Sequence, residues 1–176
     1  KRSFNRRPQG GGGGRNRRPA WPKNEGQEGQ VEERKTAHIP AIEEGVIRVI
    51  PLGGVEEIGK NMTAIEIGDD IIVIDAGMSF SNETTPGIDY VIPNTRYLEE
   101  RKHKIRALIV THGHLDHIGG IPFIMERIGN PTIYTQYLTS LMILKRQEEF
   151  PHMEPVTMQV IKEGEGFTVG KMKVKT

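Results

Sequence analysis

Residues 111–120 read Thr-His-Gly-His-Leu-Asp-His-Ile-Gly-Gly. The side chains of His112, His114, Asp116 and His117 are of the types that usually bind zinc or a similar divalent ion. A helix brings side chains to one face only every three or four residues. Ligands packed this closely therefore predict a turn on which they converge on more than one metal ion.

The flanking residues place this turn between a strand and a helix. Residues 105–110 are apolar apart from Arg106 and include three β-branched residues, which predicts a buried strand. The apolar residues that follow predict one wall of a helix: Ile118, Ile121, Phe123, Ile124, Met125 and Ile128. The candidate site is thus expected at the carboxyl end of a strand, where α/β proteins tend to place their sites.

The cluster can hold two ions. His112 and His114 can seat one, and Asp116 with His117 can seat a second nearby. Two divalent ions roughly 3.5–4 Å apart can share a hydroxide and clamp the oxygens of a phosphodiester. The predicted reaction class is hydrolysis, with Asp116 as the catalytic residue in its role as a metal-bound carboxylate. The cluster alone leaves phosphodiester, lactam and thioester substrates open.

Several motifs of the chain resemble those of a known family. The loop resembles the second signature of the metallo-β-lactamase superfamily. Residues 52–61 (Leu-Gly-Gly-Val-Glu-Glu-Ile-Gly-Lys-Asn), 75–77 (Asp-Ala-Gly) and 87–93 (Gly-Ile-Asp-Tyr-Val-Ile-Pro) extend the likeness to the ribonuclease J family. The resemblance covers roughly residues 46–176. Leu115 stands where many relatives carry an acidic residue, at a position that points away from the metals.

The resemblance implies a fold and a set of roles. The fold class is α/β, the N-terminal part of an αββα sandwich in which two sheets lie between helices. Asp75 is implied to support the metal loop, residues 111–120, through hydrogen bonds and not to bind a metal itself. Gly87 and Asp89 are implied as oxygen donors to a structural cation, although Asp89 as a turn residue or helix cap is an equal alternative. The implied cofactors are two zinc ions, with manganese or magnesium as alternatives, and a structural calcium.

The chain also divides by composition. Residues 1–37 carry ten Lys or Arg against four Glu, so a total of +1 leaves residues 38–176 with a net charge of −5. The tail, residues 1–37, is predicted to be disordered because it has few large apolar side chains, and residues 38–176 to form the N-terminal portion of the metallo-β-lactamase domain. Five arginines of the tail are predicted to attract RNA phosphates: Arg6, Arg7, Arg15, Arg17 and Arg18. A solvated linker is the alternative.

Partners and location follow partly from the resemblance. Ribonuclease J implies an RNA substrate, cut from the 5′ end or internally in RNA processing and decay. It also implies a homodimer or homotetramer and contact with other RNA-decay proteins. No apolar run approaches the roughly 20 residues that span a bilayer, and the chain has no cysteine. We therefore expect no membrane contact and a cytoplasmic location.

The remaining superfamily ligands are not found after His117, because His152, the one later histidine, is expected at the surface. The chain is therefore expected to be an N-terminal fragment, inactive by itself, that lacks the rest of its domain and the β-CASP domain of the family. Two other functions stay open. One is a metallo-β-lactamase-type hydrolase of a small molecule, such as a glyoxalase or lactamase. The other is a non-catalytic RNA-binding subunit.

Periodicity predicts the other elements. The strands are expected at 46–50, at 62–67 with 71–74 as a hairpin, and at 131–134. A short helix is expected over 94–104, and an amphipathic helix with a core-facing Met and Leu stripe from Tyr137 to near Phe150. Residues 157–161 and 167–174 are predicted to pair as a hairpin. The loop at 53–59 is interpreted as structural or as the rim of an active site, with direct substrate contact as the alternative.

Overall fold

The computed structural model describes residues 39–80 and 87–176. The predicted disordered tail, with the five arginines predicted to attract RNA, lies outside these ranges. The unit that carries every described helix and strand runs from Pro40 to Thr176.

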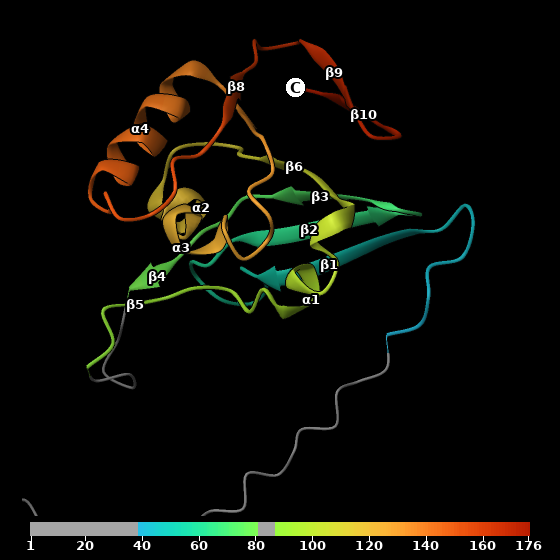
Figure 1. Ribbon diagram of the computed structural model, residues 1–176, viewed down its shortest axis with the longest axis horizontal. Coiled ribbons are helices and arrows are strands. Elements are labelled where there is room, and N and C mark those ends of the chain that lie inside the picture. The colour runs from blue at the N-terminus through green and yellow to red at the C-terminus, as the bar shows by residue number, and fades with distance from the viewer. Residues whose placement is uncertain (1–38, 81–86) are drawn as a thin grey trace, which may run out of the picture. The chain divides into compact units, whose positions relative to one another are not determined.

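A six-stranded sheet in the order β1-β2-β3-β6-β7-β8 forms the centre of this unit (Figure 1). Its strands are β1 (Ile47–Gly53), β2 (Met62–Ile67), β3 (Asp70–Ile74), β6 (Ile105–Ile109), β7 (Ile133–Thr135) and β8 (Met158–Val160). The first three are antiparallel neighbours, and β6, β7 and β8 add in parallel to β3. The predicted hairpin of β2 and β3 is confirmed, and so is the buried strand β6 before the metal loop.

Helices cover one face of this sheet. They are α1 (Arg96–Glu99), the 3-10 turn η1 (Lys102–Lys104), α2 (Leu115–Ile118), α3 (Ile121–Ile124) and α4 (Tyr137–Glu148). Leu98 and Ile124 are fully buried against Val73 and Leu108 of the sheet. Burying side chains of this size contributes about 1.5–3 kcal/mol each, so the helical layer holds β3 and β6 in place.

A hairpin covers the opposite face. Its strands β9 (Gly166–Val169) and β10 (Met172–Lys175) place Val169 and Met172 against Ile72 and Ala107 of the sheet. A separate pair, β4 (Ser79–Phe80) and β5 (Tyr90–Val91), flanks undescribed residues 81–86. The order of helices, sheet and second sheet confirms the predicted fold class.

The predicted helix wall after the metal loop is broken. Its residues are buried, apart from the half-buried Phe123, but α2 ends at Ile118 and α3 begins at Ile121. The amide of Gly120 donates to the carbonyl of Ala76 at 2.9 Å, and Pro122 has no amide to donate. The backbone bonds of a continuous helix are therefore lost at this point.

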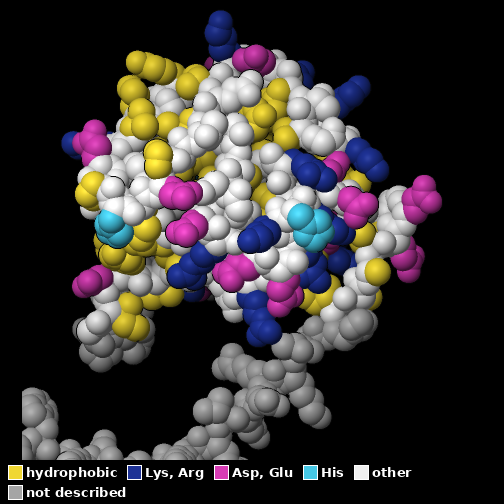
Figure 2. All heavy atoms as spheres, viewed as in Figure 1, with side chains coloured by type: hydrophobic (Ala, Val, Ile, Leu, Met, Phe, Trp, Pro, Cys, Tyr) yellow, Lys and Arg dark blue, Asp and Glu magenta, His cyan; other side chains and the backbone are white. Residues whose placement is uncertain are grey.

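The core-facing stripe predicted for α4 is wrong. The buried residues of this helix are Thr139, Ser140 and Ile143, whereas Leu138 is 70% exposed and Leu141, Met142 and Leu144 are also exposed. Apolar side chains accordingly show at the surface over α4 in Figure 2. Periodicity identified an apolar face, but the small Thr139 and Ser140 form the face that packs closely on the layer below.

Three other boundaries differ from the sequence prediction. Residues 158–160 form β8 in the main sheet and pair with β7, while β9 pairs with β10 across the turn at Gly170. The helix expected over 94–104 is split into α1 and η1, and β1 continues through Pro51. In the described ranges, no helix is long and apolar enough to cross a membrane.

Candidate metal centre

Three loops meet at the carboxyl ends of β3 and β6, and backbone hydrogen bonds join them. The amide of Ala76 donates to the carbonyl of His117 at 2.8 Å, and the amide of Met78 donates to that of Leu115 at 3.2 Å. From the glycine-rich loop, the amide of Asn61 donates to the carbonyl of Asp116 at 3.0 Å. The metal loop is therefore held by its neighbours through main-chain contacts that do not use its own side chains.

Glycines make this close approach feasible. A methyl group added at Gly77 would lie 1.6 Å from the carbonyl oxygen of Asp116, and one at Gly120 would lie 2.6 Å from that of Gly77. No side chain larger than hydrogen fits at either position without a shift of the backbone. Gly77 and Gly120, the last residue of the histidine motif, are thus required for the close packing of the loops at the site.

The structure brings the four candidate ligands together in two pairs. His112 Nε2 lies 3.1 Å from His114 Nδ1, and His117 Nε2 lies 3.4 Å from Asp116 Oδ2. The rings of His112 and His117 are 4.0 Å apart between centroids. His112 and His114 are exposed, and Asp116 and His117 are half-buried.

The buried carboxylate of Asp75 lies beneath the cluster. It accepts hydrogen bonds from the amide of Thr111 at 2.9 Å and from the Thr111 hydroxyl, and its Oδ2 is 2.7 Å from His117 Nδ1. An ionised carboxylate only accepts hydrogen bonds, so we assign the proton of the neutral His117 ring to Nδ1. The lone pair of Nε2 then faces Asp116. Asp75 adopts φ 60°, a conformation that non-glycine residues seldom occupy.

Thr111 connects the same carboxylate to His112. Its hydroxyl donates to Asp75, which leaves an oxygen lone pair for His112 Nδ1 at 3.1 Å. With its proton on Nδ1, His112 presents the Nε2 lone pair toward His114. The carboxylate therefore orients two of the three histidines, one directly and one through a hydroxyl.

These donors fit divalent ions. Two ligand atoms bound at about 2.0–2.1 Å to a tetrahedral ion are separated by roughly 3.3 Å, close to the 3.1 Å and 3.4 Å observed within the two pairs. Each pair supplies only two ligands, however. Among residues 39–80 and 87–176, no three His, Asp or Glu side chains form a complete metal site. The cluster is thus a partial donor set for two ions.

The other candidate residues are separate from this cluster. Gly87 and Asp89 are exposed in the segment before β5, and their role as cation ligands stays a prediction. His103 and His152 are exposed, as expected. Leu115 lines a cavity of about 210 Å³ with Met142, Lys145 and Arg146, on the α4 side of the loop.

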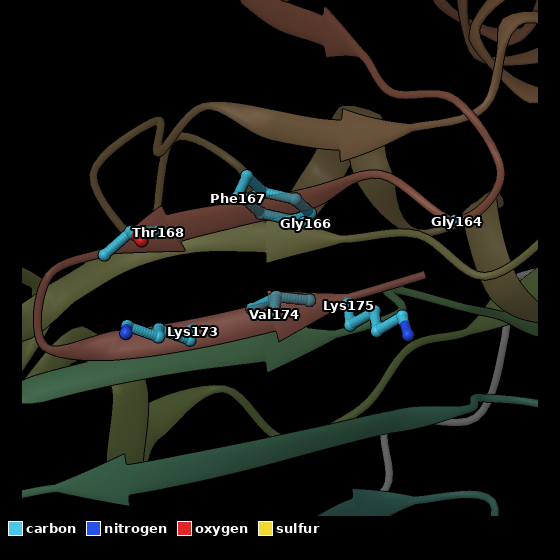
Figure 3. Close-up of a pocket in the computed structure, with 7 residues that line it drawn as sticks. All are labelled: Gly164, Gly166, Phe167, Thr168, Lys173, Val174 and Lys175. Atoms are coloured by element: carbon cyan, nitrogen blue, oxygen red, sulfur yellow. The ribbon is translucent and has the colours of Figure 1, made fainter.

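A larger cavity, of about 440 Å³, lies elsewhere. It is formed by the β9–β10 hairpin and the glycine-containing turn before it, and Figure 3 shows Thr168, Lys173 and Lys175 around it. None of the four candidate ligands lines this cavity. Size therefore does not identify the site, and the chemistry of the side chains does.

Sequence reasoning missed the role of Asn61. Its amide nitrogen lies 3.0 Å from Asp116 Oδ2 and 3.2 Å from His117 Nε2. The available signal was its place at the end of the glycine-rich loop, directly before a strand, in a segment interpreted as structural or as an active-site rim.

Comparison with known proteins agrees with this geometry. The family model of the metallo-β-lactamase superfamily matches residues 55–175. The chain belongs to this superfamily, and membership implies divalent metal ions. Within it, the predicted resemblance to ribonuclease J is confirmed by curated relatives of that name.

The chain is 43% identical to ribonuclease J of Mycoplasma pneumoniae over 102 residues, which are 58% of this chain and 18% of the relative. It is 46% identical to ribonuclease J of Thermus thermophilus over 108 residues, 59% of this chain and 19% of the relative. It thus spans about a fifth of these proteins. A solved protein of unknown function from Enterococcus faecalis shares the fold, with a TM-score of 0.52 and 20% identity over 72% of this chain and 36% of that one.

Proposed function

We propose that the protein hydrolyses RNA phosphodiester bonds with two divalent ions held by residues 112–117. The observation that carries this proposal is the pairing of donor atoms, 3.1 Å apart in His112 and His114 and 3.4 Å apart in Asp116 and His117. Divalent ions at such a loop supply a water nucleophile of lowered pKa and neutralise charge on the phosphodiester.

The side chains of the loop have separate roles in this proposal. His112 and His114 hold one ion through the two nitrogens that lie close together, and Asp116 with His117 holds the other. Asp116 is the proposed catalytic residue because its carboxylate is the anionic group at the reacting centre. Asp75 keeps His117 in the tautomer that offers Nε2, in the manner of carboxylates that orient metal-bound histidines.

The identity of the substrate rests on similarity. Relatives at 43% and 46% identity are ribonucleases J, and the Arg-rich residues 1–37 would add electrostatic attraction to phosphates. By the same similarity, the proposed reaction is 5′-to-3′ exonucleolytic with additional internal cuts. It serves RNA processing and decay in the cytoplasm, in a homodimer or homotetramer together with other RNA-decay proteins.

The proposed cofactors are two zinc ions, or manganese or magnesium in their place, with a structural calcium at Gly87 and Asp89. We expect the 176-residue chain by itself to be inactive. Its described residues supply two donors per ion, whereas catalytic zinc sites use three protein ligands.

RNA hydrolysis by the full-length protein tests this function. The protein is stripped with a chelator, reloaded with zinc or manganese, and mixed with labelled 5′-monophosphate RNA, a β-lactam or a thioester. We expect metal-dependent hydrolysis of RNA alone. His114→Ala should reduce the rate about a hundredfold or more, while His103→Ala on the exposed turn η1 should leave it unchanged.

The other outcomes identify the alternatives. Hydrolysis of the lactam or the thioester with RNA left intact would indicate a small-molecule enzyme. Metal-independent RNA binding without hydrolysis of any of the three substrates would indicate a non-catalytic RNA-binding subunit. Release of mononucleotides, as opposed to internal fragments, would distinguish exonuclease from endonuclease activity.

A further inference from the structure

Asn61 contacts both donor atoms of the second predicted ion. Its Nδ2 is 3.0 Å from Asp116 Oδ2 and 3.2 Å from His117 Nε2, and these two acceptors are themselves 3.4 Å apart. The side-chain amide of Asn61 therefore contacts Asp116 Oδ2 and His117 Nε2 at the same time. Within the described residues, only Asn61 and Asp75 donate to or accept from the Asp116 and His117 side chains from outside the metal loop.

The backbone fixes Asn61 in this place independently of its side chain. Its amide donates to the carbonyl of Asp116 at 3.0 Å, and its carbonyl accepts from the amide of Gly77 at 3.0 Å. Space for the side chain comes from Gly54, where a methyl group would lie 2.2 Å from Asn61 Oδ1. The glycine-rich loop is thus shaped to admit this amide to the metal loop.

The two contacts differ in what they permit. The Nε2 atom of His117 has one lone pair, because its Nδ1 carries the proton that Asp75 accepts. That lone pair serves either the amide or a metal ion. A carboxylate oxygen has two lone pairs, so Asp116 Oδ2 can keep the hydrogen bond from Asn61 and still bind an ion. The contact to Asp116 would thus be compatible with a bound ion, whereas the contact to His117 would have to give way to it.

We propose that Asn61 is a positioning residue that orients the Asp116 carboxylate for the second ion. It supports Asp116 as Asp75 supports His117, so each of these two ligands has its own hydrogen-bonding partner from a neighbouring loop. Before the ion arrives, the amide also holds the His117 lone pair and keeps the two donor atoms close together. This inference rests on the proposed function, because it takes the ions to bind where that function places them.

Metal titration of the full-length protein tests the inference. We expect wild type to bind two equivalents of manganese or zinc by isothermal titration calorimetry. Asn61→Ala should weaken the second equivalent about 10- to 100-fold, the range found when partners of metal ligands are lost, and leave the first unchanged. Asn94→Ala is the matched control, because it removes an asparagine whose Oδ1 accepts from the amide of Arg96, at the start of α1.

A second measurement needs no variant. The side-chain amide resonance of Asn61 in wild type should stay in place during the first equivalent of metal and move during the second. The imidazole Nε2 resonance of His117 should move in the same step. Both signals report the exchange of one hydrogen bond for a metal, which a purely structural asparagine would not show.

The outcomes separate the two proposals. If wild type binds two ions and Asn61→Ala binds both with unchanged affinity, the inference fails and the metal site stands. Equal weakening of both equivalents, together with an amide resonance that does not move, would make Asn61 a structural residue and also overturn it. If wild type binds no ion at all, the proposed function and the inference fail together.

Discussion

The carboxylate of Asp75 lies 2.7 Å from Nδ1 of His117, on a residue that is only 5% exposed and has a positive φ. It also accepts from the amide and hydroxyl of Thr111. One side chain at the end of β3 therefore connects a strand of the sheet to two histidines of the metal loop.

Replacing this carboxylate should weaken metal binding. Asp75→Asn has one acceptor oxygen for three donors, so His117 loses its fixed tautomer, and we expect affinity for metal to fall about 10- to 100-fold. Calorimetric titration measures this. Asp70→Asn removes an equally buried aspartate at the other end of β3 and should leave affinity unchanged. Equal affinity in Asp75→Asn and wild type would contradict the role given to Asp75.

The Thr111 hydroxyl should contribute to stability and metal binding through its hydrogen bonds, which a valine of the same shape cannot form. Thr111→Val keeps the backbone bond to Asp75 but removes the connection to His112 Nδ1. We expect a loss of about 1–2 kcal/mol in the free energy of unfolding and weaker binding of the ion at His112 and His114. Thr135→Val, which loses a hydroxyl hydrogen bond to the carbonyl of Val110, is the control. If both variants bind metal equally well, the hydroxyl does not orient His112.

Gly77→Ala tests the close approach of the loops. Its methyl group would meet the carbonyl oxygen of Asp116 at 1.6 Å, so the two loops must move apart. We expect thermal unfolding to show destabilisation of about 1–3 kcal/mol or more, together with weaker metal binding. Gly166→Ala is the control, since its methyl group would lie 3.6 Å from the carbonyl oxygen of Val174 and should change stability little. An unaffected Gly77→Ala protein would show that the loops are not in contact.

Acid stability should depend on Asp70. Its pKa lies below the ordinary value, chiefly because Arg106 donates a 2.6 Å hydrogen bond and also because the amide of Lys171 donates one. A lowered pKa in the folded state stabilises the fold above the unfolded-state pKa of about 4, and this contribution is lost as pH falls through the folded value. Asp70→Asn should therefore be less stable at pH 7 by about 1–3 kcal/mol.

The pH dependence completes this test. Denaturant unfolding from pH 7 down to pH 2 should show that Asp70→Asn loses less stability than wild type over the acidic range. Asp69→Asn, whose side chain is 83% exposed, should follow the wild-type curve. A variant curve parallel to that of wild type would show that Asp70 has no such linkage.

Much of the architecture was predictable from the sequence because it depends on local pattern. The apolar residues before the histidines form β6. The two apolar stretches on either side of residues 68 and 69 form the β2–β3 hairpin. The three histidines and Asp116 were chosen as candidate ligands by residue type and spacing alone, and their role as metal ligands stays a prediction. These features can be predicted without knowing the tertiary contacts of the residues.

Other features depend on tertiary contacts and could not be predicted. The helix break after Ile118 arises because the amide of Gly120 bonds to Ala76, more than forty residues earlier in the chain. The direction of the apolar face of α4, and the pairing of β8 with β7, are set by elements that a local pattern does not specify. The place of Asn61 at the end of the glycine-rich loop did not reveal its contacts for the same reason, since its partners lie 55 and 56 residues away.

The most direct test of the central claim is to measure metal content and RNA hydrolysis on the same sample of full-length protein during metal titration. We predict that hydrolysis is absent in excess chelator, rises as the second equivalent binds, and is lost in His114→Ala and Asp116→Ala. Hydrolysis that persists in chelator, or in both variants at full rate, would contradict a metal-dependent ribonuclease site at this loop.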